Sequence, residues 1–130
     1  MTTINPIFTG VAAHIGKYAD AVVVSGGGDT LILVSGTPGL REDGTVPEDF
    51  TDEARQCWAN VERALDKAGA KLTDIVHMRQ WVTSRHNASA YLAVSKEVIR
   101  HQPAAMFSII DGLVWPDIRV EVEVIAILPA

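Results

Sequence analysis

The segment Ile118–Leu128, "IRVEVEVIAIL", decides the fold, because its side chains alternate in character residue by residue. Successive side chains of a β-strand point to opposite faces of a sheet, so the alternation predicts a strand whose two faces differ. One face is apolar enough to be buried, and the other combines charged side chains with two isoleucines. The apolar face comprises Val120, Val122, Val124, Ala126 and Leu128, and the mixed face comprises Arg119, Glu121, Glu123, Ile125 and Ile127.

Other segments also predict strands. The β-branched runs Ala21–Ser25 and Thr30–Ser35 are separated by the turn formers Gly26–Asp29, which is typical of a hairpin. A glycine-rich phosphate loop would be followed by a helix, whereas this loop is followed by the strand-like "TLILV". The segment 104–110, "AAMFSII", predicts a short strand. In Asp74–Thr83 the alternation puts Val76, Met78, Gln80 and Val82 on one face and His77, Arg79 and Trp81 on the other.

Two helices are predicted from the three-and-four spacing of apolar residues. Thr51 is the expected N-cap of the first helix, with two acidic residues in its first turn, and Gly69 is its expected stop. The second helix is expected from about Asn87 to Arg100, and Pro103 prevents its continuation. The expected buried faces are Ala54, Cys57, Trp58, Val61, Ala64, Leu65 and Ala68 in the first helix and Tyr91, Leu92, Val98 and Ile99 in the second.

The order of these elements is a hairpin, a helix, a strand, a helix and two strands, which predicts an α+β fold with a single mixed sheet and both helices on one face. No change in composition divides the chain, so residues 1–130 are expected to form one domain. The opposite face would carry Trp81 beside the mixed face of the last strand. This surface is too apolar for free water and too charged for a core. We therefore expect a second subunit to cover it, with a ligand site between subunits.

Composition and charge exclude several classes of protein. The formal net charge is −5 and no Lys/Arg stripe is present, which argues against a nucleic-acid partner. The longest apolar runs are far shorter than the roughly 20 residues of a membrane span, and the N-terminus "MTTINPIFTG" has no apolar signal core. With one cysteine, Cys57, the chain forms no internal disulfide and is expected in the reducing cytoplasm.

Several motifs are distinctive when they are taken together. "GKYADAV" and "ILVSG" precede a Gly/Pro-rich loop, which is followed by "EARQCWANVERALDKAGAKLTDIVHMRQWVTS" and finally by "PAAMFSII" and "RVEVEVIAIL". In this combination the chain resembles, from about Gly16 to Leu128, the RidA/YjgF family of reactive-intermediate deaminases. The resemblance implies a fold like that of trimeric chorismate mutase and a homotrimer with three sites between neighbouring subunits. It also implies hydrolysis of 2-iminoacids, or their enamine tautomers, to 2-ketoacids and ammonia without a metal or organic cofactor.

The resemblance also identifies site residues and departures from the family pattern. Deaminases of the family hold the substrate carboxylate with the arginine of a Pro-Ala-Arg-Ser motif, and a guanidinium suits this task because it pairs with a carboxylate through two hydrogen bonds. Here the motif is Pro103-Ala104-Ala105-Met106, so Ala105 replaces the arginine, and Phe107 stands where cysteine is frequent. Tyr18 and Glu121 match the family's tyrosine and water-handling glutamate. The departures imply that the standard 2-iminoacid deaminase activity is weak or absent.

Each candidate residue has a purely structural alternative. Glu121 is either the catalytic acid/base group or one half of a cross-strand ion pair. Tyr18 either contacts the substrate or packs with its hydroxyl satisfied. Arg79 and Arg119 either hold an anionic substrate in place of the missing arginine or are solvated or paired surface charges.

The remaining reactive side chains favour structural roles. His77 is expected as a polar residue of the sheet face, and Cys57 as a small buried hydrophobe. His14, His86 and His101 lie in loops or at helix ends without metal-ligand spacing, so no metal site is expected.

Two classes of function stay open. One is an enzyme: a divergent Rid-type hydrolase or deaminase acting on a small imine, enamine or related reactive metabolite. The other is a non-catalytic trimer that binds a small metabolite or shields a reactive intermediate. The missing arginine favours the second class, whereas Tyr18 and Glu121 favour the first. Chorismate-mutase-like isomerisation is a weaker third alternative, because its dicarboxylate substrate would also demand arginines in the pocket.

Overall fold

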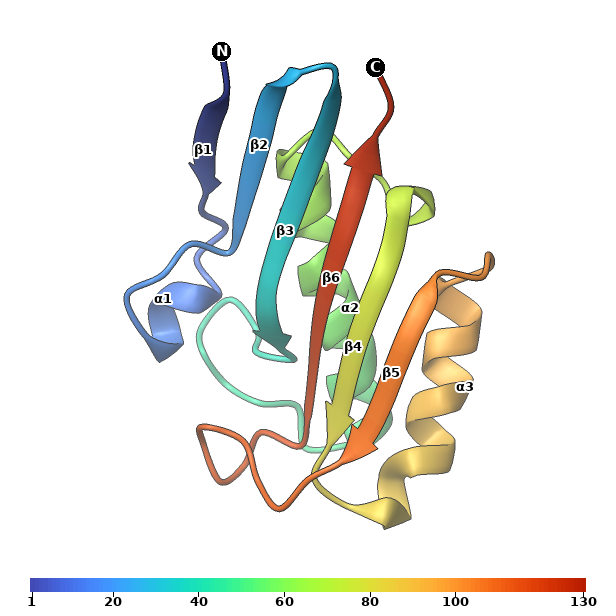
Figure 1. Cartoon of the computed structure of the whole chain (residues 1–130). Helices are drawn as coiled ribbons and strands as arrows, with labels where there is room; N and C mark the ends of the chain where they lie inside the picture. Colours follow the sequence, from blue (N-terminus) through green and yellow to red (C-terminus); the bar gives the residue numbers. More distant parts are fainter.

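The computed structural model describes residues 1–130 and consists of a mixed six-stranded sheet with two long helices on one face (Figure 1). This architecture confirms the predicted α+β class. Two 3₁₀ turns, Leu72–Asp74 and Arg85–Asn87, precede β4 and α3. The elements are β1 (Thr3–Ile7), α1 (Ala12–Ile15), β2 (Ala21–Gly27), β3 (Asp29–Pro38), α2 (Phe50–Lys67), β4 (Ile75–Val82), α3 (Ala88–Val98), β5 (Ala104–Ile109) and β6 (Val120–Leu128).

The last strand of the chain lies in the middle of the sheet. The strand order is β1-β2-β3-β6-β4-β5. Neighbouring strands are antiparallel except β4 and β5, which run parallel and are connected through α3. Strand β6 is therefore hydrogen-bonded along both edges, to β3 and to β4 (Figure 1). A central strand that buries one face alternates in polarity, and this explains the regular pattern of Ile118–Leu128.

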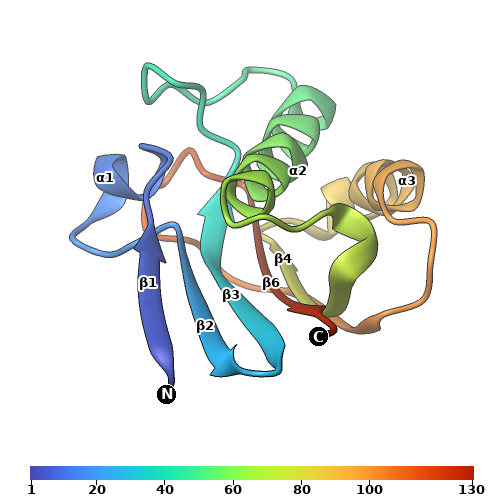
Figure 2. The ribbon, with the colours of Figure 1, turned by 90° about the horizontal axis from the view of Figure 1, so that it is seen from above.

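Helices α2 and α3 cover one face of the sheet, and the other face has no helix over it (Figure 2). We call the second face the open face. On the covered face the β6 side chains pack against α2, whose Trp58 is only 1% exposed. The alternation predicted for β6 is confirmed, because one set of side chains is at most 1% exposed and the other set is partly exposed. The first set is Val120, Val122, Val124 and Ala126, and the second is Glu121, Glu123, Ile125 and Ile127.

Helix α2 begins earlier than expected. Asp49, not Thr51, is the N-cap, because its side chain accepts a hydrogen bond from the backbone N–H of Asp52 at 3.1 Å. An aspartate just before the first turn satisfies a free N–H group and complements the helix dipole. Gly69, with φ +90°, follows the last turn and provides the predicted stop.

Strand β4 departs from the predicted alternation at its start. Ile75 pairs with Ala126 of β6, but His77 pairs with the next residue, Ile125, so β4 contains one extra residue at this point. Such a bulge shifts the alternation of side chains. Val76, which was expected on the covered face, is therefore 44% exposed, and Ile75 is buried instead.

Helix α3 buries the expected stripe only in part: Tyr91 and Ile99 are buried and Val98 is partly buried, as predicted, but Leu92 is not. Leu92 is 49% exposed, whereas Tyr91, Val94 and Ser95 are buried. Ser95 is tolerated there because its hydroxyl donates to Oε1 of Gln80 at 3.2 Å. A stripe defined by apolar residues alone misses this buried serine.

None of the helices is long and apolar enough to cross a membrane.

The edge strand β1 has no counterpart among the predicted strands. It pairs only with β2, and Ile7 is its single buried residue. Pro6 interrupts the strand-like composition, and a proline is compatible with a strand mainly at a sheet edge, where its missing N–H group leaves no partner unsatisfied.

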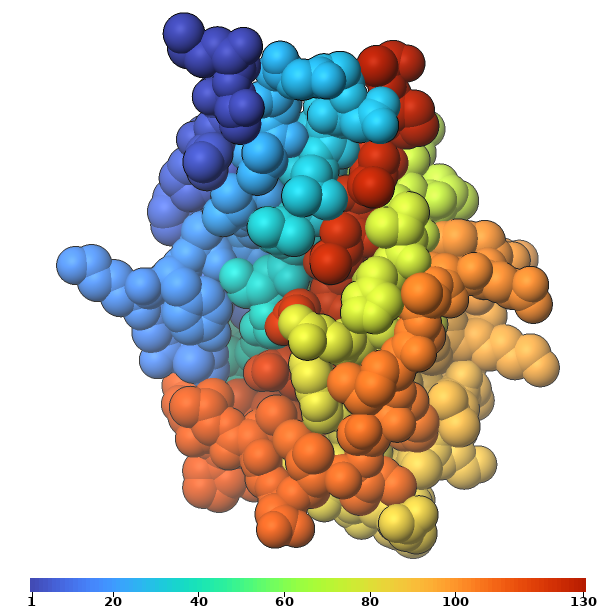
Figure 3. All heavy atoms as spheres, viewed as in Figure 1, coloured from blue at the N-terminus to red at the C-terminus, as the bar shows by residue number.

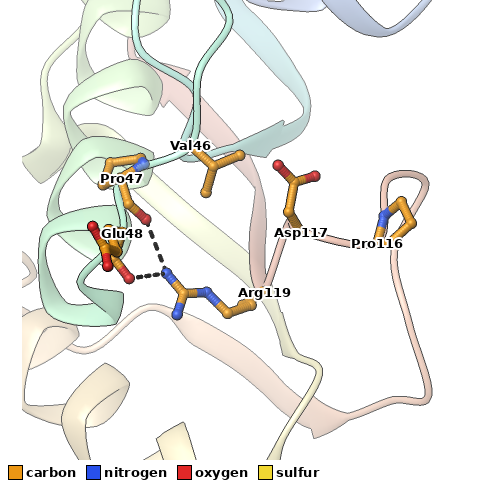
Figure 4. A pocket seen from close by; sticks show the side chains of 6 residues that line it. All are labelled: Val46, Pro47, Glu48, Pro116, Asp117 and Arg119. Carbon is orange, nitrogen blue, oxygen red and sulfur yellow. Dashed lines mark hydrogen bonds between the residues drawn. The ribbon is translucent and has the colours of Figure 1, made fainter.

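Arg119 was predicted to lie on the open face, but the structure places its side chain elsewhere. It precedes β6, and its guanidinium reaches the start of α2, where Nε donates to Oε1 of Glu53 at 2.6 Å and the backbone N–H donates to Oε2 at 2.8 Å. Nη2 donates to the carbonyl oxygens of Pro47 and Glu48 at 2.9 and 3.0 Å (Figure 4). The guanidinium also lies 5.6 Å from the centre of the Phe50 ring. A fully buried carboxylate needs such a partner, and this requirement draws Arg119 to α2.

Arg119→Ala should therefore destabilise the protein. Removing the guanidinium leaves Glu53 buried and unpaired, so we expect the free energy of unfolding in urea to fall by about 3 kcal/mol. Arg55→Ala is the matched control, because Arg55 pairs with Glu97 between exposed side chains 3.6 Å apart. The control should cost less than about 1 kcal/mol. Equal losses in the two variants would contradict the role given to Arg119.

Candidate functional site

A hollow of about 520 Å³ opens at one end of the open face. The segment containing α1 and the loop that precedes β6 lie side by side there, at the ends of β3 and β6 (Figure 3). The hollow brings together Tyr18 and Glu121, two residues that the sequence identified as site candidates but that lie far apart in the chain. Its lining consists of Ile15, Tyr18, Ser35, Gly36, Val114, Glu121 and Glu123.

The segment that carries Tyr18 is held to the sheet by hydrogen bonds. The buried carboxylate of Asp20 accepts from the backbone N–H groups of Thr9 and Ala12, both at 2.8 Å. The hydroxyl of Ser35 donates to the carbonyl oxygen of Ala19 at 2.6 Å. These contacts tie both sides of α1 to the sheet and place Tyr18 over the end of β3.

Gly36 makes room for the carboxylate of Glu121. A Cβ atom at this position would lie 2.7 Å from Oε2 of Glu121, closer than a Cβ atom approaches another heavy atom. The register between β3 and β6 shifts between Val34 and Thr37, and this irregularity brings Gly36 beside Glu121. Sequence reasoning did not identify Gly36 as a site residue, although it ends the motif "ILVSG".

Glu121 has the electrostatic character of an acid/base group. Burial raises the pKa of its carboxyl, and the nearby charge of Glu123 raises the pKa further. The structural alternative, a cross-strand ion pair of Glu121, is not formed, since Arg79 pairs with Glu123 instead. In the β4–β6 register Glu121 lies opposite Trp81, and Arg79 lies opposite Glu123. Glu121 is therefore a half-buried carboxyl without a cationic partner in its own chain.

Tyr18 is 42% exposed and keeps its hydroxyl proton. Burial raises the pKa of the phenol, and the charges of Glu121 and Asp20 raise it further. A neutral phenol can donate a hydrogen bond to an oxygen or nitrogen atom of a bound ligand. Tyr18 thus provides a proton donor beside the Glu121 carboxyl.

Ala105 and Phe107 lie away from this hollow. In the parallel β4–β5 ladder Ala105 pairs with Met78 and Phe107 pairs with Gln80, and both of those β4 residues point to the covered face. The Phe107 ring stacks on Tyr91 of α3, with ring centres 5.2 Å apart. Ala105 is exposed because β5 is the edge strand. Within one chain, Ala105 and Glu121 therefore point to opposite faces of the sheet.

Other reactive side chains do not form a second centre. Cys57 is fully buried, its thiol donates to the carbonyl oxygen of Thr37 at 3.0 Å, and burial raises the thiol pKa well above the ordinary value. This agrees with the predicted role of Cys57 as a small hydrophobe. His77 is partly exposed on the open face of β4. No three His, Cys, Asp or Glu side chains are grouped as metal ligands would be.

A second hollow, of about 370 Å³, contains Arg119 (Figure 4). The guanidinium is already bound by Glu53 and by two backbone carbonyl oxygens, and the side chains of Glu48 and Asp117 add negative charge nearby. Arg119 is thus placed to stabilise the start of α2 rather than to receive an anion. The hollow at Glu121 is the better candidate site.

Comparisons with known proteins agree on one family. The family model described as Endoribonuclease L-PSP matches residues 9–128. The chain is 31% identical over 101 residues to the RutC family protein YjgH of Escherichia coli K12, covering 76% of each chain. It is 29% identical over 116 residues to the 2-iminobutanoate/2-iminopropanoate deaminase of Dermatophagoides farinae, covering 88% of each.

Solved structures share the fold. The YjgF gene product of E. coli superimposes with a TM-score of 0.78 at 29% sequence identity, covering 94% of this chain and 97% of the other. The structure of E. coli TdcF with bound serine gives a TM-score of 0.78 at 25% identity, covering 88% and 90%. This chain therefore shares its fold with these proteins.

The titration of Glu121 tests the electrostatics of the hollow. Because burial and Glu123 both disfavour the ionised carboxylate, the Glu121 carboxyl should titrate above its ordinary pKa of 4.5. Glu123→Gln removes one of these causes and leaves Arg79 without its partner, so the midpoint should move down. Carbon NMR of labelled glutamates measures both midpoints, and Glu62→Gln, on the exposed side of α2, should change neither. A wild-type midpoint at or below 4.5 would contradict the description of the hollow.

Proposed function

The chain belongs to the RidA/YjgF family, whose model is described as Endoribonuclease L-PSP, and we propose that it hydrolyses small imines or their enamine tautomers in a cleft between subunits. The observation that carries the proposal is the half-buried Glu121 carboxyl, with a raised pKa, beside the Tyr18 phenol in one hollow. A relative named 2-iminobutanoate/2-iminopropanoate deaminase supports this class of chemistry.

The proposed reaction needs only an acid/base group and a proton donor. Glu121 accepts a proton from water as the water oxygen bonds to the C=N carbon. Glu121 then returns the proton to nitrogen, the C–N bond breaks as the hydroxyl proton passes through Glu121 to the leaving nitrogen, and the products are a carbonyl compound and ammonia. A carboxyl whose pKa is raised performs both transfers more readily near neutral pH, because its proton affinity lies closer to that of the solution. Tyr18 donates a hydrogen bond to the added oxygen or to the nitrogen. The proposal requires no metal and no organic cofactor.

The position of Ala105 supports a site shared between subunits. In the family's deaminases the motif arginine and the glutamate act on one substrate, yet here Ala105 and Glu121 point to opposite faces of the same sheet. Residue 105 of one chain can therefore approach the hollow of a neighbouring chain more readily than its own. We propose a homotrimer in which the open faces are covered by neighbouring subunits.

The missing guanidinium limits the substrates. Replacing a charge-assisted bidentate contact by a methyl group forfeits on the order of 1.5 to 3 kcal/mol of binding to a carboxylate, or roughly 10-fold to 150-fold. We therefore propose that hydrolysis of simple 2-iminoacids is weak or absent. If no imine is hydrolysed, the alternative is a non-catalytic trimer that binds or shields a small metabolite.

The hollow does not suit cleavage of RNA, which the name of the family model describes. Its only charged lining residues are Glu121 and Glu123, and the chain has a net charge of −5. Nucleic-acid sites neutralise phosphates with clustered Lys and Arg side chains. The charge distribution therefore favours a small-molecule ligand.

Glu121→Gln tests the catalytic assignment. The amide cannot accept the proton of water, so hydrolysis of any imine substrate should fall by about 100-fold or more. The assay generates imines from several amino acids and amines with an oxidase and follows their decay. Glu62→Gln is the control and should retain full activity, because Glu62 is exposed on α2. Full activity of a correctly folded Glu121→Gln variant would place the chemistry elsewhere.

Ala105→Arg tests the role of the motif position. Restoring the guanidinium should raise kcat/KM for simple 2-iminoacids by roughly 10-fold to 150-fold. The exposed edge position of Ala105 accepts a longer side chain without disturbing the core. Rapid hydrolysis of 2-iminoacids by the wild-type protein, comparable to that of an arginine-containing relative, would show that the arginine is dispensable.

Sedimentation equilibrium tests the assembly. At micromolar concentration we expect a single species with three times the 14.0 kDa mass of one chain, because Trp81, Ile125 and Ile127 give the open face an apolar component. A clean monomer would refute both the trimer and the shared site.

A further inference from the structure

The hollow at Glu121 contains carboxylates but no cationic side chain. Of its two carboxylates, Glu123 is matched by the guanidinium of Arg79, to which it is ion-paired. Glu121 takes part in none of the ion pairs of the protein. When ionised, Glu121 is therefore the one negative charge of the hollow that has no cationic partner.

Other cations are poorly placed to change this balance. The motif 103–106 is Pro-Ala-Ala-Met in every copy of the chain, so a neighbouring subunit brings no charge with it at residue 105. Arg119 is bound to Glu53 at the start of α2. Lys17 precedes Tyr18 in sequence, but it is exposed and does not line the hollow. Neither the chain's own residues nor residue 105 of a neighbour therefore gives a ligand carboxylate at Glu121 a matched cation.

We propose that the substrates are imines or enamines without a carboxylate, and that they bind with the imine nitrogen protonated and facing Glu121. This inference rests on the proposed function. A protonated imine supplies the positive charge that would balance ionised Glu121. Protonation also makes the imine carbon more electrophilic than in the neutral imine, so water adds to it more readily. A 2-iminoacid would instead place a second negative charge in a partly desolvated hollow. Ile15 and Val114 supply apolar contacts for a hydrocarbon substituent.

The proton balance of this reaction is simple. The oxygen of water bonds to the C=N carbon while one of its protons passes to Glu121. Glu121 returns that proton to nitrogen, and the C–N bond breaks as the hydroxyl proton leaves to the Glu121 carboxylate. The resulting ammonia takes this proton, so a protonated imine and water give a carbonyl compound and ammonium.

Two imines that differ only in a carboxylate test the inference. A flavin amine oxidase converts benzylamine to phenylmethanimine, and a flavin amino-acid oxidase converts phenylglycine to 2-imino-2-phenylacetate. We expect the kcat/KM of this protein for phenylmethanimine to exceed that for 2-imino-2-phenylacetate by about tenfold or more. The reason is that Glu121 attracts the protonated imine and repels the carboxylate. Equal efficiencies, or a preference for the carboxylate-bearing imine, would overturn the inference.

Calorimetry separates the failure of this inference from the failure of the proposed function. If neither imine is hydrolysed, the hydrolytic function is refuted, and the charge preference is tested by the binding of benzylammonium and benzoate. Tighter binding of benzylammonium supports the inference when Glu121→Gln abolishes the preference and Glu62→Gln preserves it. Equal or tighter binding of benzoate by the wild-type protein overturns it.

Discussion

The alternation of side chains along β6 is the constraint on which the rest of the structure depends. Because β6 lies between β3 and β4, its valines form the centre of the core beneath α2. The same alternation forces Glu121 and Glu123 onto the open face. Burying one face of the strand therefore places two carboxylates together on the other, where only one of them is neutralised by Arg79.

The fold could be predicted where local pattern and tertiary packing agree. The hairpin, both long helices and the central strand follow from periodicity and turn chemistry. The errors arose where a non-local contact overrides the pattern. A bulge against β6 exposes Val76, a hydrogen bond to Gln80 buries Ser95, and the buried carboxylate of Glu53 recruits Arg119. None of these partners can be identified from spacing along the chain.

The candidate site was predictable only in part. Tyr18 and Glu121 were identified through resemblance to a family, and the structure brings them into one hollow. Gly36, Ile15 and Val114 were not identified, because a register shift brings Gly36 to the hollow, and because the α1 segment and the loop before β6, which carry Ile15 and Val114, meet only in the folded chain. The motif position Ala105 was expected in a pocket between subunits, and within one chain it lies on the face of the sheet opposite Glu121. This separation supports the proposed site shared between subunits.

Mixed trimers test that shared site most directly. A chain carrying both Glu121→Gln and Ala105→Arg has the guanidinium but not the carboxyl, and the wild-type chain has the reverse. Each chain alone should form a homotrimer that hydrolyses 2-iminoacids weakly or not at all. If the site joins Glu121 of one subunit to residue 105 of the next, trimers that contain both chains should hydrolyse 2-iminoacids faster than either homotrimer. The account would be contradicted if the mixed trimers showed no such hydrolysis while a chain carrying both Glu121 and Ala105→Arg did.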